Sequence, residues 1–213
     1  MEPIKFYHNP MSRGATVHWM LEEVEAKYEI VLLDFKRRDH KTPQYLAINP
    51  LGKIPAIVYK GVVITETPAI CTFLADNYSL NKLAPFLDDP FRGAYLRWMF
   101  FASTCVEPVL VDRMFKRENP DPSSTGYGTY AETMSILDRQ LQKTAFILGP
   151  EFTAVDVYLS SQLSWGVRAK ALEATPAMSA YIARCQERPA FKRFYVQSTA
   201  LIEKIQAMQA AAQ

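Results

Sequence analysis

Three short stretches in the first third of the sequence contain residues that could bind and activate a small polar ligand. The stretch NPMSRG places Ser12 where a helix is expected to begin, KIPAI is centred on Pro55, and ETP starts at Glu66. A serine at a helix start can simply cap the helix, which is worth about 1 kcal/mol. The same hydroxyl, with the N–H groups of the first turn, can also stabilise an anion such as a thiolate.

The ETP stretch combines an acid with a helix start. We expect Thr67 to be the N-cap and Pro68 the first helical residue. The Thr67 hydroxyl and the N–H groups at the helix start suit a carboxylate, while Glu66 suits an ammonium group. The plainer alternative is that Thr67 only caps the helix and Glu66 only stabilises its first turn.

The elements that must position these residues alternate along residues 1–78. Strand-like runs cover 4–7, 28–35 and 55–66, and the last is divided by Gly61 into a predicted hairpin. Apolar residues at helical spacing predict a helix after NPMSRG, and a second helix follows ETP. The order is β-α-β, a short irregular helix, then β-β-α.

The second part of the chain has a different texture. A linker is expected at 79–90, and from residue 91 no strand pattern appears. The first long apolar helix after the linker is expected to be interrupted by Pro108. Thr153 and Asp156 have capping-box spacing, which we assign to folding rather than to catalysis. The expectation is an α/β domain at 1–78 and an all-helical domain at 91–213 whose last turns fray.

Composition narrows the function classes. The 213 residues are 49% hydrophobic with a net charge of +2, and the charges are interspersed, which gives little support to nucleic-acid binding. No long apolar run or leader-like start is visible, so neither a membrane span nor a signal peptide is expected. The cysteines and histidines lack metal-site or disulfide spacing, which favours a reducing, cytoplasmic setting without a metal. They are Cys71, Cys105, Cys185, His8, His18 and His40. His18 is expected at a surface or an interface.

Four stretches in this order resemble the glutathione S-transferase superfamily, in particular its bacterial-type, serine-type cytosolic members. They are NPMSRG, residues 47–57, residues 64–78 and FTAVDVY at 152–158. The resemblance covers nearly the whole chain. It implies a thioredoxin-like N-terminal domain that binds glutathione, an all-helical C-terminal domain that shapes an electrophile pocket, and a homodimer.

Glutathione is a γ-Glu-Cys-Gly peptide with a carboxylate at each end and a thiol in the middle. By resemblance, the Ile54–Pro55 bond is cis, and the Ile54 N–H and C=O pair with the cysteinyl backbone. Glu66 and Thr67 then hold the γ-glutamyl end, and Lys53 is a candidate for the glycyl carboxylate. The alternatives are that Pro55 merely starts a strand and that Lys53 is a solvated surface residue.

Thiol activation requires a donor that favours the thiolate over a thiol whose free pKa is about 8.5. Members of the family use a tyrosine, serine or cysteine after the first strand. Ser12 ranks first here, Arg13 second through its backbone or guanidinium, and Tyr7 third. Tyr7 lies farther from the Arg13–Gly14 pair than in tyrosine-type members, and the face of its strand is left open.

The electrophile pocket is weakly specified by the sequence. The candidates share an apolar side chain near the implied pocket, although such residues at helical spacing are more often part of a core. They are Met11, Phe101, Met114, Phe115 and Trp165.

The implied activity is transfer of the glutathione thiolate to hydrophobic, electrophilic small molecules, with glutathione as co-substrate. A glutathione-dependent isomerase, dehalogenase or peroxidase on the same fold is the alternative, as is a non-catalytic binding module. Disulfide reduction is disfavoured, because Met11, Ser12 and Arg13 stand where a cysteine would be needed.

Overall fold

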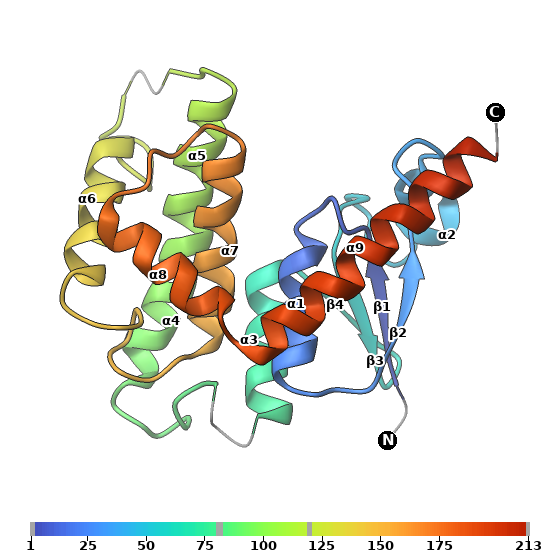
Figure 1. Ribbon diagram of the computed structural model, residues 1–213, viewed down its shortest axis with the longest axis horizontal. Helices are drawn as coiled ribbons and strands as arrows, with labels where there is room; N and C mark the ends of the chain where they lie inside the picture. The colour runs from blue at the N-terminus through green and yellow to red at the C-terminus, as the bar shows by residue number, and fades with distance from the viewer. Residues whose placement is uncertain (1–2, 80–82, 119–120, 212–213) are drawn as a thin grey trace. The chain divides into compact units, whose positions relative to one another are not determined.

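The computed structural model describes residues 3–79, 83–118 and 121–211, arranged as two compact units (Figure 1). Unit 1 comprises 1–79 together with 188–213, and unit 2 comprises 80–187. The last helix is therefore grouped with the N-terminal residues, whereas the sequence assigned it to the helical domain. Residues 80–82 of the expected linker lie outside the described part.

Unit 1 is built on a four-stranded sheet with the order β2-β1-β3-β4. Its strands are β1 (Ile4–His8), β2 (Tyr28–Leu32), β3 (Ala56–Tyr59) and β4 (Val62–Thr65). β1 runs parallel to β2, and β3 runs antiparallel to both β1 and β4. Lys60 and Gly61 have φ of 50° and 80°, which is the backbone of the predicted two-residue hairpin turn.

Strand register brings the three candidate stretches to one end of this sheet. Tyr7 of β1 is the partner of Ala56 in β3, and Ala56 is the partner of Thr65 in β4. The chain after β1, before β3 and after β4 therefore leaves the sheet at the same end. Residues distant in sequence, Ser12, Ile54 and Glu66, belong to these three segments.

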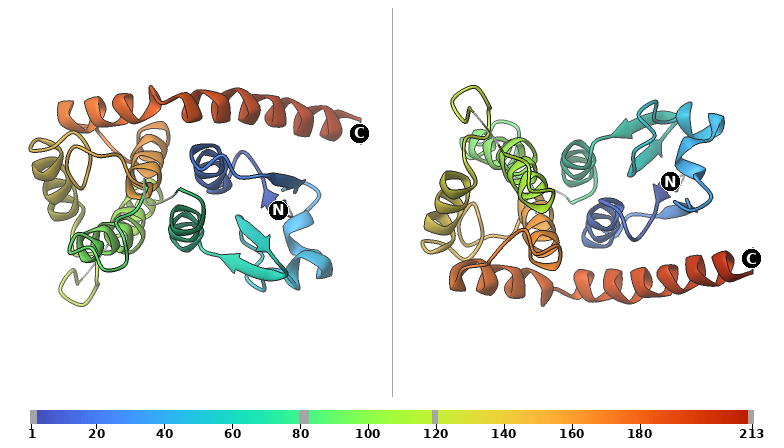
Figure 2. Two further views of the ribbon diagram at one scale, coloured as in Figure 1. Left: turned by 90° about the horizontal axis from the view of Figure 1, so that it is seen from below. Right: turned by 90° about the horizontal axis from the view of Figure 1, so that it is seen from above.

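Helices cover both faces of the sheet (Figure 2). α1 (Gly14–Glu23) and α3 (Thr67–Tyr78) lie on one face, and α2 (Pro43–Leu46), after the short 3₁₀ turn Asp39–Lys41, lies on the other. Strand alternation matches this arrangement. The buried Phe6 and His8 contact His18 of α1, while the intervening Tyr7 contacts Tyr45 of α2.

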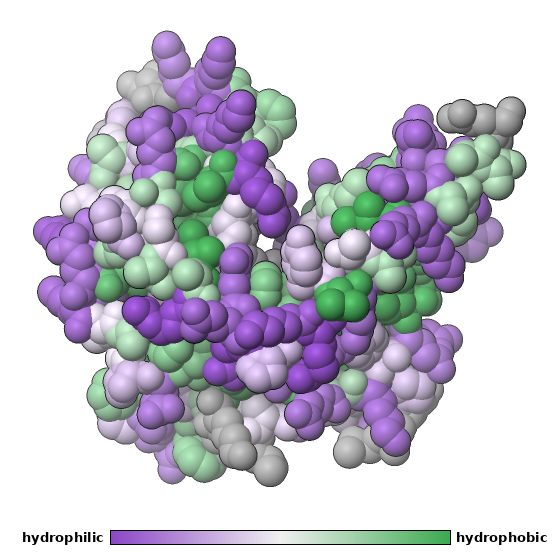
Figure 3. Space-filling model, viewed as in Figure 1, coloured by the Kyte–Doolittle hydropathy of each residue, from purple (hydrophilic) through white to green (hydrophobic). Residues whose placement is uncertain are grey.

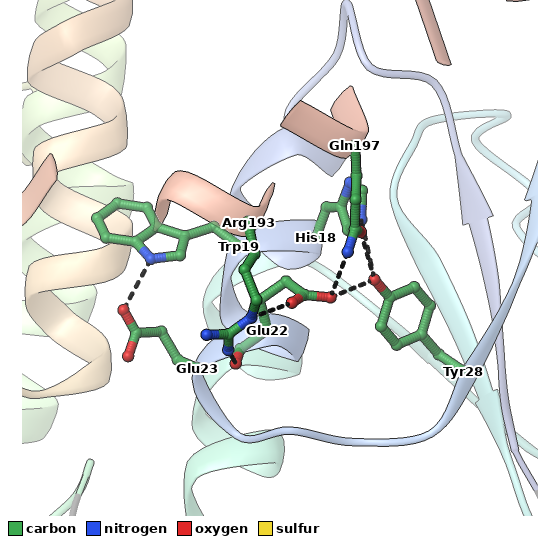
Figure 4. A network of polar contacts seen from close by, with 7 residues as sticks. All are labelled: His18, Trp19, Glu22, Glu23, Tyr28, Arg193 and Gln197. Atoms are coloured by element: carbon green, nitrogen blue, oxygen red, sulfur yellow. Dashed lines mark hydrogen bonds and ion pairs between the residues drawn. The ribbon is translucent and has the colours of Figure 1, made fainter. Parts of the chain in front are cut away.

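The helix α9 (Pro189–Ala210) packs along α1 and is fixed there by a polar network (Figure 4). Gln197 contacts His18 Nε2 at 2.8 Å, and Arg193 donates to Glu22 at 2.9 Å. Tyr28 of β2 donates to Glu22 at 2.6 Å. His18 is thus fully buried, so its expected place at a surface is wrong: the sequence could not show that α9 returns over α1.

The C-terminal segment, where the sequence predicted fraying, is helical within the described residues. α9 continues to Ala210, and Gln209 donates to Asp34 at 2.8 Å, which anchors its end. The surface along α9 mixes hydrophilic and hydrophobic residues (Figure 3). Val196, for example, is 70% exposed.

In its described residues, unit 2 consists of helices and loops. Its helices are α4 (Arg92–Phe101), a π-helical turn (Ala102–Val106), α5 (Glu107–Met114), α6 (Tyr130–Leu141), α7 (Ala154–Arg168) and α8 (Pro176–Gln186). Pro108 does not interrupt the helix as expected: the helical backbone continues from α4 through the π-helical turn into α5. Proline cannot bond to the carbonyl four residues earlier, and a π turn is a known way to alter the hydrogen-bond ladder at such a point.

The fully buried Asp156 organises the start of α7. Its carboxylate accepts from the Thr153 N–H at 2.8 Å, the Ile147 N–H at 2.9 Å and the Tyr181 hydroxyl at 2.8 Å. Burial raises the pKa of Asp156, and these donors partly oppose that rise. The expected pairing of Thr153 with Asp156 is confirmed, and the contacts extend beyond a local cap to two distant segments.

Candidate functional site

The loop between β1 and α1 is held by the side chain of Asn9, which is fully buried. Asn9 Nδ2 donates to the Leu33 carbonyl just beyond β2 at 2.7 Å, and Asn9 Oδ1 accepts from the Met11 N–H at 2.8 Å. The Asn9 carbonyl accepts from the Ser12 N–H at 3.1 Å. One side chain therefore ties the Ser12 loop to the end of the neighbouring strand.

Ser12 takes part in the start of α1, which begins at Gly14 with Arg13 in the N-cap position. The Ser12 hydroxyl donates to the Asn9 carbonyl at 2.7 Å and accepts from the Gly14 N–H at 3.0 Å. A hydroxyl has one proton to donate. Ser12 must therefore rotate away from Asn9 before it can donate to a ligand sulfur.

The start of α1 packs tightly against the end of β1. A Cβ atom at Gly14 would lie 2.5 Å from His8 Nδ1 and 3.0 Å from Ser12 Oγ, so a larger residue would force both apart. His8 is fully buried and its two ring nitrogens have no hydrogen-bond partner among the described residues. Burial, and then the charge of His18, holds the pKa of His8 well below its usual value.

Tyr7 lies on the opposite face of the sheet from His8. Its ring contacts Tyr45 of α2, with the ring centroids 5.5 Å apart. The face left open by the sequence is thus the face that α2 covers, whereas α1 and Ser12 follow the other face.

The Ile54–Pro55 peptide bond is cis, as the resemblance implied. The loop before it is braced at the Lys53 carbonyl, which accepts from the Tyr45 hydroxyl at 2.5 Å and from Asn49 Nδ2 at 2.9 Å. The Ile54 N–H and C=O have no hydrogen-bond partner within the described residues. An extended peptide could therefore pair with them as an added strand. Lys53 itself is exposed.

The start of α3 leaves polar groups available. Thr67 is the first helical residue and Glu66 occupies the N-cap position, so the predicted N-cap was one residue too late. Proline is tolerated anywhere in the first turn, which explains the ambiguity. Glu66 is exposed and adopts φ 63°, ψ 114°, a conformation that is costly for a residue with a Cβ.

Within the described part of the chain, neither side chain at this helix start is used for a hydrogen bond or an ion pair. Among the described residues no partner is recorded for the Thr67 hydroxyl, and Glu66 makes no ion pair there. The first N–H groups of α3 point out of the helix start, where its dipole favours an anion. The arrangement offers an acceptor for an ammonium group next to donors for a carboxylate.

The electrophile candidates lie in both units. Met11 is 55% exposed in unit 1. In unit 2, Phe101 packs edge-on against Trp98 at 5.4 Å and Phe115 is 59% exposed. Met114 and Trp165 are half-buried.

Unit 2 contains a cavity of about 390 Å³ between the end of α5 and the segment that leads into α6. Its lining includes Arg113, Lys116, Tyr127 and Tyr130, and none of the electrophile candidates. The part of the chain that the structure describes holds no group of three side chains suited to a metal, and no helix there has the length and apolarity needed to cross a bilayer.

The fold defines the class of protein first: a thioredoxin-like domain with a separate helical unit. The family model described as the N-terminal domain of glutathione S-transferase matches residues 2–76. The chain is similar to a glutathione transferase of Phanerochaete chrysosporium, URE2P8, solved with oxidized glutathione. The TM-score is 0.77 and the identity 26%, over 95% of this chain and 98% of that one.

Two further relatives agree. The curated glutathione S-transferase GstA of Escherichia coli O157:H7 is 26% identical over 87% of this chain and 94% of its own length. A glutathione transferase family member from Pseudomonas fluorescens, solved with two glutathione molecules bound, has a TM-score of 0.77 at 25% identity. It covers 91% of this chain and 92% of its own. Residues 2–76 therefore form a glutathione S-transferase N-terminal domain, and over nearly its whole length the chain is similar to glutathione S-transferases.

Sequence reasoning missed two asparagines of this site. Asn9 and Asn49 each precede a proline and each brace a candidate loop. The repeated Asn-Pro pair was the visible signal, since asparagine readily bonds the backbone two residues on. The Leu33 carbonyl, the long-range partner of Asn9, could not be identified from spacing.

Proposed function

We propose that this chain is a glutathione transferase that conjugates the glutathione thiolate to hydrophobic electrophilic small molecules. The observation that carries the proposal is the start of α3, where an exposed Glu66 and an available Thr67 hydroxyl flank the first N–H groups. Strand register puts the unpaired Ile54 backbone at the same end of the sheet. The names of the relatives and the glutathione in their structures support the same ligand.

Binding follows from four complementary contacts. Glu66 accepts from the γ-glutamyl ammonium, and Thr67 with the α3 N–H groups donates to the γ-glutamyl carboxylate. The Ile54 N–H and C=O pair with the cysteinyl backbone. Lys53 extends to the glycyl carboxylate.

The thiol then lies near the start of α1. Ser12 turns its hydroxyl from the Asn9 carbonyl to the sulfur, and backbone N–H groups near Arg13 add to the field that favours the thiolate. Tyr7 is the third candidate. The protein acts by positioning and stabilising the nucleophile, which attacks the electrophile directly.

The remaining parts of the proposal rest on the family. Met11, Phe101, Met114, Phe115 and Trp165 are the candidates for the electrophile pocket. The enzyme works as a homodimer in the cytoplasm, with glutathione as its co-substrate.

The first test is a titration. Glutathione at millimolar concentration should raise the melting temperature by mass action, and an aryl halide should be conjugated. No shift in melting temperature would overturn the proposal. Binding without conjugation would instead favour a glutathione-dependent isomerase, dehalogenase or peroxidase.

The second test concerns thiol activation. Ser12→Ala should lose most of the conjugation rate while it keeps glutathione affinity, whereas Tyr7→Phe should keep both. Equal losses, or a loss in Tyr7→Phe alone, would reverse the ranking of the two hydroxyls.

A further inference from the structure

We propose that Asn9 is the positioning residue for thiol activation: its buried side chain holds the Ser12 loop in the geometry that the bound sulfur requires. This inference rests on the proposed glutathione transferase function. Asn9 does not belong to the ligand-facing set, because it is fully buried and its side chain is committed to the protein.

The side chain of Asn9 links two parts of the sheet end. Nδ2 reaches the Leu33 carbonyl, 24 residues away in sequence, at 2.7 Å, and Oδ1 holds the Met11 N–H at 2.8 Å. Both bonds are made by one rigid amide, so the loop has little freedom to shift relative to β2. The same residue's carbonyl receives the Ser12 N–H and the Ser12 hydroxyl.

The consequence for Ser12 is direct. The Ser12 hydroxyl donates to the main-chain carbonyl of Asn9, whose position the Asn9 side chain fixes. The Ser12 carbonyl accepts from the Ala15 N–H at 3.1 Å at the start of α1. If the side-chain amide of Asn9 is removed, the loop can change its conformation. The Ser12 hydroxyl and the first N–H groups of α1 would then no longer point toward the same ligand atom. Electrostatic stabilisation of a thiolate depends on donors that are already in place, so the loss falls on thiol activation.

The chain provides a matched control in Asn49. It also precedes a proline and is 4% exposed. Asn49 Oδ1 accepts from the Leu51 N–H at 3.1 Å, Nδ2 donates to the Lys53 carbonyl at 2.9 Å, and its carbonyl accepts from the Gly52 N–H at 2.8 Å. The two braces are built alike, but Asn49 holds the loop that ends at Ile54. Its loss should disturb peptide binding rather than the thiol.

The experiment measures the pKa of the enzyme-bound glutathione thiol from the ultraviolet absorbance of the thiolate, together with kcat and KM for glutathione. For Asn9→Ala we expect the bound thiol pKa to rise by about one unit, so that the thiolate fraction is up to about tenfold smaller at pH values below that pKa, with kcat restored at higher pH. KM for glutathione should stay within about twofold. Asn49→Ala should raise KM and leave the thiol pKa in place.

A second variant keeps the test decisive if Asn9→Ala does not fold. Asn9→Ser retains an oxygen for the Met11 N–H but cannot bridge to Leu33, so its bound thiol pKa should lie between those of the wild type and Asn9→Ala. A folded Asn9 variant with the wild-type thiol pKa, or a rise of equal size in Asn49→Ala, would overturn the role of Asn9 alone. Wild-type protein that fails to bind glutathione would overturn the proposed function as well.

Discussion

Two helix starts, one in each unit, place a threonine and an acid together and use them in opposite ways. At α7, Asp156 is buried and its carboxylate accepts from Thr153, Ile147 and Tyr181. At α3, Glu66 is exposed and adopts φ 63°, and its carboxylate has no hydrogen-bond or ion-pair partner among the described residues. The acid of α7 is committed to the fold, and the acid of α3 is left for something outside it.

Residue types alone therefore do not assign a helix start to folding or to binding. Thr153 lies before α7 with the acid three residues further on, so the acid can turn back to the cap. Glu66 precedes Thr67 directly, so its side chain cannot reach back over the helix end. Spacing therefore decides whether the acid closes the N-terminus or leaves it open.

The largest expected effect is on stability and comes from removing Asp156, the buried acid at the start of α7. Asp156→Ala leaves four donor groups, on Thr153, Ile147 and Tyr181, without their buried acceptor, and we expect the free energy of unfolding to fall by about 3–5 kcal/mol. Thermal and urea unfolding measure the loss. The matched control is Glu132→Ala, because the capping box of Glu132 with Thr129 on α6 is exposed; it should cost about 1 kcal/mol or less.

An Asp156→Ala variant that kept its melting temperature and lost conjugation would contradict the assignment of Asp156 to folding. Asp156 would then act in the reaction, and its contacts would be incidental.

The next largest effect is on glutathione binding and concerns Glu66, the exposed acid at the start of α3. Glu66→Gln should weaken glutathione binding about 10- to 100-fold, since a charge-assisted hydrogen bond is worth about 1.5–3 kcal/mol. Its free energy of unfolding without ligand should change by less than about 0.5 kcal/mol. The control is Glu29→Gln at an exposed position of β2. A large loss of unliganded stability in Glu66→Gln would show that this acid, too, serves the fold.

The buried histidines of unit 1 should make the stability of the fold depend on pH. Burial lowers the pKa of His8 and of His18, so the unfolded chain takes up their protons first. The stability from the neutral rings is present above their ordinary pKa of about 6.5 and is lost as the pH falls below it. Both rings should therefore destabilise the fold progressively as the pH falls below about 6.5, and His8, whose pKa is held well below its usual value, should contribute more than His18.

The measurement compares melting temperatures of the wild type and His8→Leu between about pH 8 and pH 5.5, the range set by the ordinary histidine pKa. The variant should lose less stability on acidification than the wild type. Parallel curves would show that His8 does not contribute to the acid sensitivity.

The smallest expected effect belongs to Thr67. Thr67→Val keeps the shape and removes the hydroxyl, so glutathione affinity should fall about two- to tenfold, in line with a neutral hydrogen bond of about 0.5–1.5 kcal/mol. Unfolding without ligand should be little changed, because no partner of the hydroxyl is recorded within the described residues. Thr153→Val at α7 is the contrasting variant and should lose stability instead.

Local patterns predicted much of this molecule. The hairpin at Lys60–Gly61 and the Thr153–Asp156 pair follow from residue types at fixed spacing. The start of α3 was placed one residue late, because Pro68 is compatible with either frame. These features depend on neighbours in the chain, which a sequence displays directly.

Features that depend on distant contacts could not be predicted. His18 was expected at a surface or an interface, because no residue near it in the sequence indicates that Gln197 of α9 contacts it. The partner of Asn9 is Leu33, and its identity follows from the pairing of β1 with β2. The convergence of Ser12, Ile54 and Glu66 likewise depends on strand register, which local patterns leave open.

The most direct test of the open helix start is a calorimetric titration of glutathione and of its analogue without the γ-glutamyl amino group, into the wild type and into Glu66→Gln. We predict that the wild type binds glutathione about tenfold or more tightly than the analogue, and that Glu66→Gln binds the two almost equally, since the missing ammonium is the partner of Glu66. An undiminished preference for glutathione in Glu66→Gln would show that Glu66 does not bind the γ-glutamyl ammonium.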